Sequence, residues 1–190
     1  EPNYRYNTMP SFESWDRYQF VLSNGYHHQF TRNMLQLNNG DATFSEIGRL
    51  ADVEATDWSW GALIFDMDGD GIKDLFVANG IYQDLTDQDY IQFASNEEFM
   101  KKVMTGGETD YKQLIEAIPS NKIANYAFKN NEHLDFQNKT KDWHLDKLTH
   151  SNGSAYGDLD NDGDLDLVIN NVNMPCLIYE NRFTNNAYLK

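Results

Sequence analysis

Two short stretches of the sequence are dense in aspartate at a fixed spacing. The first runs from Asp66 to Asp74 and the second from Asp158 to Asp166, each with Asp at positions 1, 3, 5 and 9 and Gly at position 6. Carboxylate oxygens at that spacing, together with the backbone carbonyl of position 7, are hard ligands of the kind that Ca²⁺ takes. The Gly permits the sharp turn that brings the later ligands round. These residues therefore indicate cation binding.

The spacing predicts two calcium sites, one in each Asp-rich loop. The expected ligands are Asp66, Asp68, Asp70, the carbonyl of Ile72 and Asp74 in the first loop, and Asp158, Asp160, Asp162, the carbonyl of Asp164 and Asp166 in the second. Without a cation, each pair of carboxylates would repel by ~1–4 kcal/mol at ~4 Å. The alternative is a pair of solvated Asp-Gly turns. Because carboxylates fill most of the coordination shell, we expect the ions to be structural.

Other metal sites fit the two loops less well. An EF-hand requires a Glu at position 12 of the loop and flanking helices, but position 12 is Val77 in one copy and Ile169 in the other. Mg²⁺ retains several waters and is seldom held by an all-protein cage. Zn²⁺ prefers His and Cys, which are absent from both loops. The prediction is therefore calcium in a non-EF-hand loop.

The remaining chemistry-bearing residues do not form a catalytic pattern. The five histidines have no metal spacing, and Cys176 follows Pro175 with no visible His partner. No Gly-rich phosphate loop, HExxH or GxSxG occurs. Trp58 and Trp60 would point the same way from a strand, and we expect them to pack in the core, with a glycan platform as the alternative. We predict that the protein is not an enzyme.

The two loops belong to a longer internal repeat with an offset of 92 residues. At that offset Asn38 and Asn39 match Asn130 and Asn131, and Phe44 matches Phe136. Each copy predicts a hairpin, a linking stretch, a strand, the Asp loop and a β-branched strand. The expected strands are 34–37, 62–65 and 75–78 with one through Phe44, and 126–128, 154–156 and 167–169 with one through Phe136. Four strands per unit is the plan of a propeller blade, and a sandwich of meanders also fits.

The segment between the two copies has helical periodicity. Tyr111, Leu114, Ile115 and Ile118 are spaced i, i+3, i+4, i+7, and a second apolar stripe runs from Phe99 to Met104. Asn96 and Thr109 are the expected N-caps, and Gly106-Gly107 and Pro119 are the expected stops. We predict two or three short helices inserted between consecutive sheet units. Residues 15–20 are either a helix or the end of a preceding unit.

These elements give a mainly β protein made of propeller blades with a small α-helical insertion. The predicted segments are residues 1–30, an N-terminal segment with part of a preceding blade as one interpretation; 31–80, the first blade unit; 81–120, the helical insertion; 121–175, the second blade unit; and 176–190, the start of a further strand or blade. Two units are too few for a ring of ~4–8 blades. We therefore expect an arc of a longer chain.

Composition agrees with this interpretation and excludes other classes. Thirty acidic residues against 15 basic ones give a formal net charge of −15, which disfavours nucleic-acid binding. Aromatic residues make up 14% of the chain, so a packed core is expected. The single cysteine precludes an intrachain disulfide, and no apolar run approaches the ~20 residues of a membrane span.

Several of these segments carry a family resemblance. The loops and their following strands, 66–79 and 158–171, resemble FG-GAP repeats, also called VCBS repeats, of integrin-type propellers. Residues 31–48, 56–60 and 152–158 resemble bacterial surface VCBS proteins that carry an ASPIC/UnbV domain. The turn at 132–135 departs from that pattern, in which the turn is Gly-rich. The resemblance covers about 31–173 and implies a multi-bladed propeller, calcium in the blade loops and an extracellular or outer-membrane-attached location.

The sequence therefore predicts a calcium-binding propeller module that acts as an interaction or scaffold domain. Its expected partners are other blades of the same larger protein and envelope or surface proteins. The first alternative is a carbohydrate-binding or glycan-processing accessory protein, since aromatic and acidic residues are plentiful. The second is a docking subunit of an outer-membrane nutrient-uptake complex, in which the helical insertion would contact the partner.

Overall fold

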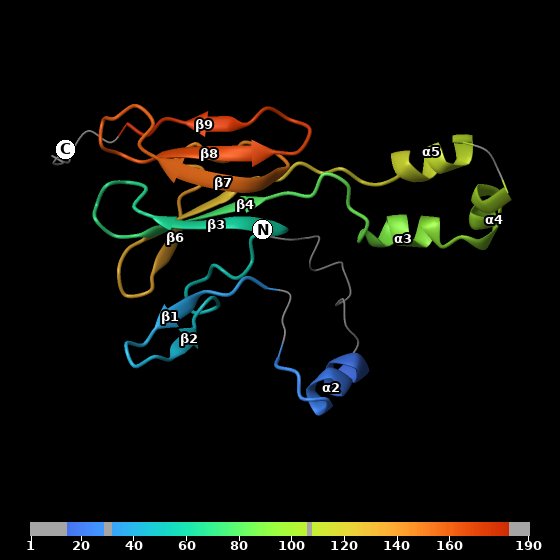
Figure 1. Ribbon diagram of the computed structural model, residues 1–190, viewed down its shortest axis with the longest axis horizontal. Coiled ribbons are helices and arrows are strands. Elements are labelled where there is room, and N and C mark those ends of the chain that lie inside the picture. The colour runs from blue at the N-terminus through green and yellow to red at the C-terminus, as the bar shows by residue number, and fades with distance from the viewer. Residues whose placement is uncertain (1–14, 29–31, 106–107, 183–190) are drawn as a thin grey trace.

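The computed structural model describes residues 15–28, 32–105 and 108–182. The fold is mainly β, with antiparallel sheets and a few short helices, as the sequence predicts. Figure 1 shows the sheets as stacked layers, with three helices extending from one end. Parts of the predicted terminal segments 1–30 and 176–190, and the Gly106-Gly107 stop, lie outside the described residues.

Nine strands form three sheets in the described part of the chain. The strands are β1 (Gln36–Asn38), β2 (Phe44–Glu46), β3 (Ser59–Phe65), β4 (Asp74–Asn79), β5 (Tyr126–Asn130), β6 (Phe136–Asn138), β7 (Ser151–Gly157), β8 (Asp166–Asn171) and β9 (Leu177–Tyr179). Their orders are β1-β2, β3-β4-β5-β6 and β7-β8-β9, and the neighbouring strands in each sheet are antiparallel. This meander order is consistent with a segment of propeller blades.

The internal repeat is confirmed by the strand bounds. β3 and β7, β4 and β8, and β2 and β6 begin and end 92 residues apart. The strand before each Asp loop also has a register irregularity that starts at an equivalent residue. It lies between Ser59 and Ala62 in β3 and between Ser151 and Gly153 in β7. The two copies therefore share backbone geometry as well as sequence.

The sheets are out of phase with the repeat. β3 and β4 come from the first copy and β5 and β6 from the second, yet all four form one sheet, in which Leu75 pairs with Phe128 and Val77 with Tyr126. The sheet boundaries therefore do not follow the predicted units 31–80 and 121–175. In the second copy the β5-β6 hairpin precedes the Asp loop along the chain but pairs with β4 of the first copy, whereas the β1-β2 hairpin of the first copy forms a separate two-stranded sheet.

The four-stranded sheet has both faces covered by apolar residues. One face packs on the β7-β8-β9 sheet through the cluster Phe65, Phe76, Ala78, Ala127, Leu145, Leu167 and Ile169. The other packs on the segment after β2 through Ala51, Val53, Leu75, Val77 and Phe128. This is why β4 is buried along its whole length. Sheets that bury both faces against neighbours are the stacking expected of consecutive blades.

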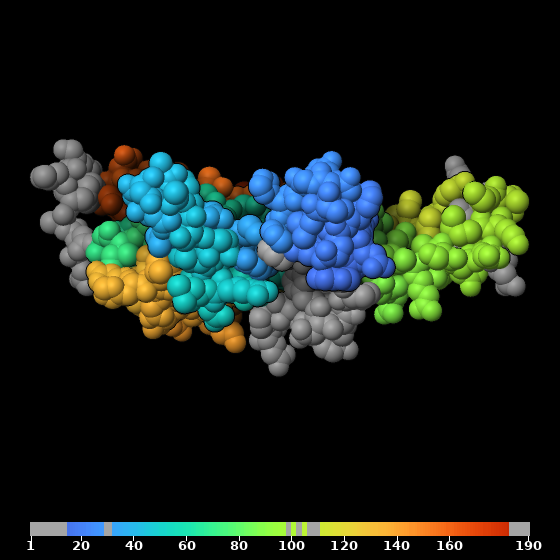
Figure 2. Space-filling model, turned by 90° about the horizontal axis from the view of Figure 1, so that it is seen from below, coloured from blue at the N-terminus to red at the C-terminus, as the bar shows by residue number. Residues whose placement is uncertain are grey.

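The insertion forms α3 (Gln88–Ala94), α4 (Glu97–Thr105) and α5 (Glu108–Glu116). Helix α4 begins directly after Asn96, the predicted cap, whereas α5 begins before Thr109. Helix α3 is capped by Asp87, whose side chain accepts the N–H of Tyr90. Figure 2 shows these helices as a lobe at one end of the molecule, and the β1-β2 hairpin in front of the sheets.

The helical lobe joins two neighbouring strands of one sheet, β4 and β5. The expectation that it lies between consecutive sheet units is therefore wrong, because the sheet closes across the insertion. Its two ends meet at its base, where Ile81 bridges Asn121 and the Asp84 N–H donates to the Pro119 carbonyl at 2.9 Å. The lobe can thus project without opening the β4-β5 pairing.

Two other sequence expectations have clear outcomes. Residues 15–20 belong to α2 (Trp15–Ser23), so the helical alternative holds. Trp60 is 57% exposed, contrary to the expected packing in the core, and its indole N–H donates to the Gly80 carbonyl at 2.5 Å. Within the described residues no helix is both long and apolar enough to span a membrane.

Candidate metal centre

Both Asp loops lie at the same edge of the stacked sheets. The first connects β3 to β4 and the second connects β7 to β8, and in Figure 1 both are at the end opposite the helical lobe. β3 and β7 contact each other across the sheet interface. The strands therefore place the two predicted sites in the same position of successive sheets.

The loop backbones turn in the same way. Gly69 and Asn161, at position 4, have φ values of 70° and 64°, and Gly71 and Gly163, at position 6, have φ values of 87° and 99°. Left-handed backbone suits Gly and is tolerated by Asn. The Asp-x-Asp-Gly/Asn-Asp-Gly pattern thus follows from the loop's shape as well as from its ligands.

The position 9 carboxylates, Asp74 and Asp166, act as braces: each is hydrogen-bonded both to its own loop and to the third strand of its sheet. Both are buried, with 0% and 2% of their surface exposed. One oxygen of Asp74 accepts the N–H of Met67 at 2.9 Å, and one oxygen of Asp166 accepts the N–H of Leu159 at 2.8 Å. The other oxygen of each accepts a backbone N–H from a residue at or just after the end of the third strand of its sheet.

Those donors are Asn130, at the end of β5, and Asn181, just after β9, each at 2.9 Å. Their side-chain amides donate to the carbonyls of Lys73 and Leu165, the position 8 residues, at 3.1 and 3.4 Å. Strand register agrees, because Leu75 pairs with Phe128 and Leu167 with Tyr179. Asn130 and Asn181 are therefore equivalent residues, and sequence analysis missed both.

In the first loop, the carboxylates of Asp66, Asp68 and Asp74 come within 4.8 Å of one another. Asp66 accepts the N–H groups of Asp70 and Gly71 at 3.1 and 2.9 Å. One oxygen of Asp68 is buried without a hydrogen-bond partner, which is costly unless a cation satisfies it. Hard oxygen donors and this unsatisfied atom fit Ca²⁺.

In the second loop, Asp158, Asp160 and Asp162 bring their carboxylates within the same 4.8 Å. Asp162 N–H donates to Asp158 at 3.1 Å and to Asp160 at 3.2 Å. The position 7 residues lie in the same turn of each loop, where Ile72 N–H donates to Asp70 at 2.8 Å and Asp164 N–H donates to Asp162 at 3.2 Å. The structure thus gathers three carboxylates in each loop.

The two loops differ in what faces them from the third strand. In the first, the Lys129 ammonium group bonds an oxygen of Asp68 and, at 2.6 Å, an oxygen of Asp70. By strand register and by the Asn130–Asn181 equivalence, the corresponding residue of the second sheet is Glu180. Glu180 pairs with Arg182 at 3.0 Å. A cation therefore faces one loop and an anion occupies the matching position at the other.

The electrostatics of the carboxylates follow this difference. The Lys129 hydrogen bond lowers the pKa of Asp70. Burial alone would lower the pKa of Lys129, but its bonds to Asp68 and Asp70 outweigh burial and raise that pKa. In the second loop, desolvation and the nearby charges of Asp162 and Asp166 raise the pKa of Asp160. Desolvation also raises the pKa of the braced Asp74. Lys129 thus compensates part of the negative charge of the first loop, and within the described residues no lysine makes the equivalent contact with Asp158, Asp160 or Asp162.

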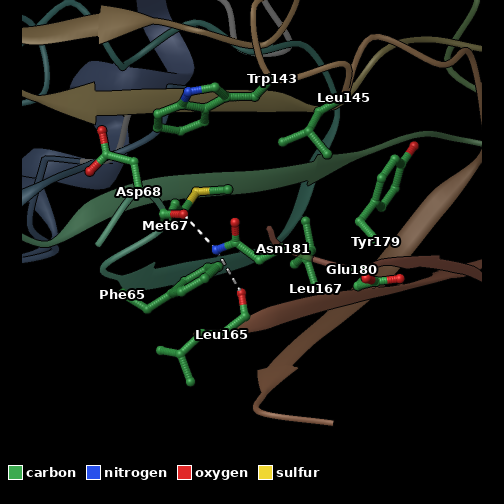
Figure 3. Close-up of a pocket in the computed structure, with 10 residues that line it drawn as sticks. All are labelled: Phe65, Met67, Asp68, Trp143, Leu145, Leu165, Leu167, Tyr179, Glu180 and Asn181. Atoms are coloured by element: carbon green, nitrogen blue, oxygen red, sulfur yellow. Dashed lines mark hydrogen bonds between the residues drawn. The ribbon is translucent and has the colours of Figure 1, made fainter. Parts of the chain in front are cut away.

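Asn181 also links the loops to each other. Its side-chain amide donates to the carbonyl of Met67 in the first loop at 2.9 Å, in addition to Leu165 in the second. Figure 3 shows both bonds among the residues that line a cavity between the sheets. The cavity has a volume of about 440 Å³. Trp143, Leu145 and Tyr179 line its apolar part, with Asp68 and Glu180 among its polar lining residues. The cavity is next to the loops, but most of its lining comes from residues at the interface between the two sheets.

Part of the chain matches a known protein family. Residues 7–77 match the FG-GAP-like repeat family. The match covers less than half of the chain and ends in β4, after the first Asp loop. The second copy repeats its strand bounds and loop geometry 92 residues later. No curated protein matches the chain. The chain thus contains an FG-GAP-like repeat in a mainly β fold, a repeat that suggests an integrin-like β-propeller module.

Proposed function

We propose that the chain is an arc of a calcium-stabilised β-propeller, with one Ca²⁺ in each Asp loop. The observation that carries the proposal is the repeated loop geometry, in which each loop brings three carboxylates within 4.8 Å of one another and has a buried Asp at position 9. The three carboxylates are those of Asp66, Asp68 and Asp74 in the first loop and of Asp158, Asp160 and Asp162 in the second. The buried oxygen of Asp68 that has no hydrogen-bond partner gives separate support for cation binding at the first loop. The five predicted ligands of each loop remain the proposed ligand sets.

The proposed role of calcium is to hold the sheets' loop edge together. Four carboxylates in nine residues repel one another, and a divalent cation converts that repulsion into attraction. The position 9 Asp connects the loop to the third strand through Asn130 or Asn181. Cation binding at the loop would therefore stabilise the sheet as a whole, and no catalytic role is proposed.

Thermal melting of the chain in millimolar CaCl₂ and in excess EDTA tests this function. With Kd values of roughly 10⁻⁴–10⁻³ M, calcium at ten times Kd or more would add about 1.4 kcal/mol or more per site, or a rise of several degrees in Tm. The double variant Asp66→Ala/Asp158→Ala should lose that response, and Lys139→Met should retain it. Equal Tm values in calcium and EDTA would refute the stabilising role.

We further propose that the module acts as a non-enzymatic scaffold or interaction domain of a secreted or cell-surface bacterial protein. Extracellular calcium modules bind weakly and suit surroundings that are always rich in calcium. The helical lobe supports an interaction role, because it projects away from the loops and exposes Ile91, Met104 and Ile115. Its partners would be other blades of the same protein and surface or envelope proteins.

The modular nature of the lobe can be tested directly. Because Ile81 pairs with Asn121, residues 83–119 can be replaced by a short turn. The shortened chain should keep its calcium-dependent rise in Tm, since the lobe lies opposite the loops. Loss of that rise would show that the helices are part of the calcium-stabilised core and do not form a separate interaction surface.

Glycan binding is a second candidate, favoured by the exposure of Trp60. Exposed aromatic rings offer an apolar face of the kind that sugars stack on. A glycan array should show hits that Trp60→Ala abolishes. Trp143→Phe, which alters the cavity between the two larger sheets, serves as a comparison and should leave those hits unchanged. An array without hits would remove this candidate.

A further inference from the structure

We propose that Lys129 is a built-in competitor for the cation of the first Asp loop, so that the two loops bind calcium with unequal affinity. This inference rests on the proposed function, because it concerns how the same two loops are regulated. It requires that Lys129 occupy ligand atoms that the metal needs, and that the second loop have no such group.

The first requirement is met by the contacts of the ammonium group. Lys129 Nζ bonds Asp68 and Asp70, the residues at positions 3 and 5 of the loop. The three side chains are only 21–30% exposed, so water screens their attraction incompletely. A Ca²⁺ ion at 2.3–2.6 Å from the same oxygens would lie close to a positive charge. Calcium must therefore displace the ammonium group or bind beside it against repulsion.

The second requirement is met by the corresponding position of the other sheet. Glu180 occupies the register position of Lys129, one residue before the bracing Asn181. Glu180 pairs with Arg182, its neighbour two residues on, so it adds no cation to the loop. The carboxylates of Asp158, Asp160 and Asp162 converge without an equivalent lysine contact in the described residues. The second loop therefore binds calcium more tightly.

Because of this difference, the two loops fill at different calcium concentrations. The second loop fills first, and the first loop fills at a higher concentration, when the ion displaces Lys129 from Asp68 and Asp70. Below that concentration the ammonium group keeps the first loop folded by neutralising part of its charge. The β3-β6 sheet thus tolerates calcium loss better than the β7-β9 sheet.

Calorimetric titration with CaCl₂ at low ionic strength tests this, one loop at a time. In an Asp158→Asn background only the first loop binds, and Lys129→Met should tighten its Kd about tenfold or more. In an Asp66→Asn background only the second loop binds, and Lys129→Met should leave its Kd within about twofold. Glu180→Lys in that same background should weaken the second loop about tenfold.

The matched control is Lys139→Met, which removes one positive charge from a pair with Asp142 near the end of the same sheet. It should change neither Kd by more than about twofold, which separates a direct contact from a general change in net charge. An unchanged first-loop Kd in Lys129→Met, with calcium still bound, would overturn the competitor and leave the proposed function standing. Absence of calcium binding in the unmodified chain would overturn both.

Discussion

The two Asp loops have the same backbone and the same brace, yet they face opposite charges. Asp74 and Asp166 are buried and bonded alike, and Asn130 and Asn181 support them alike. The residue before each of these asparagines differs. It is Lys129 in β5, next to the first loop, and Glu180 directly after β9, next to the second. Hydrogen bonds to the buried position 9 carboxylates therefore set the shape of both loops, while the charge that faces each loop is set by a residue outside the loop sequence.

The largest expected effect comes from removing what the loops share. Asp74→Ala and Asp166→Ala would each remove a buried carboxylate and leave two part-buried N–H groups without that acceptor, at a cost of about 2–4 kcal/mol in the free energy of unfolding. Urea unfolding measures this. Asp142→Ala, on an exposed pair with Lys139, should change stability by less than about 0.5 kcal/mol. If Asp74→Ala and Asp166→Ala each lowered the free energy of unfolding by less than about 1 kcal/mol, these carboxylates would not be the support that the two loops share.

The next largest effect on stability distinguishes Asn181 from Asn130. Asn181→Ala loses side-chain bonds to the carbonyls of Met67 in the first loop and of Leu165, and the bond that its oxygen accepts from the Arg182 N–H. Asn130→Ala loses its bond to the Lys73 carbonyl and the bond that its oxygen accepts from the Glu132 N–H, and no bond to the other loop. We expect a cost of about 1–2 kcal/mol for Asn181→Ala and about 0.5–1 kcal/mol for Asn130→Ala by the same unfolding measurement. An equal or larger cost for Asn130→Ala would mean that Asn181 does not link the loops.

A comparable effect distinguishes the two hairpins. Gly40 and Glu132 are equivalent and both have positive φ, at 80° and 67°. Left-handed backbone is unfavourable for Glu, so Glu132→Gly should stabilise the chain by up to about 1 kcal/mol, and Gly40→Glu should destabilise it by about 1 kcal/mol. Space is not the reason, because a Cβ at Gly40 meets nothing within 4 Å. Changes of the same sign in both variants would contradict this explanation.

The smallest effect concerns pH at another equivalent pair, Glu46 and Asn138. Each side chain accepts a backbone N–H, from Gly48 and Thr140 respectively, but only Glu46 titrates. Hydrogen bonds from Arg32 and Gly48 lower the pKa of Glu46 from 4.5 to about 2. Because the folded pKa is depressed, the stabilisation is present above the unfolded pKa and is lost as pH falls from about 4.5 towards 2.

The variant Glu46→Gln should therefore be less stable than the unmodified chain at pH 6, and the difference should shrink as the pH approaches 2. Urea unfolding of both proteins across that range measures it. Arg32→Gln should produce a similar narrowing, because it removes the partner of Glu46. A difference that stays constant from pH 6 to pH 2 would contradict the assigned ion pair.

Sequence patterns were sufficient for the parts of the fold that depend on local chemistry. The Asp-Gly spacing located both loops, and β-branched runs located β4 and β8. The repeat aligned Lys129 with Leu37, which lies in the matching hairpin of the preceding copy. Lys129 and Glu180 become equivalent only when β5 pairs with β4 across the helical lobe, and β9 pairs with β8 without one. That long-range pairing leaves no local signal.

The position of the insertion was missed for the same reason. Helical periodicity predicts helices between 96 and 118, but it does not say whether the flanking strands belong to one sheet. One available signal was the recurrence of Asn after the third strand, at Asn38, Asn130 and Asn181. The exposure of Trp60 could not be predicted from its type, because an aromatic residue on a strand fits either face.

The most direct test of the central claim is a crystal structure of the chain grown in millimolar CaCl₂, with calcium located by its anomalous scattering. The account predicts one ion in each loop, 2.3–2.6 Å from oxygens of Asp66, Asp68 and Asp74 in the first and of Asp158, Asp160 and Asp162 in the second. It also predicts that the Lys129 ammonium group has left Asp68 and Asp70. Loops that hold only water at that calcium concentration would contradict it.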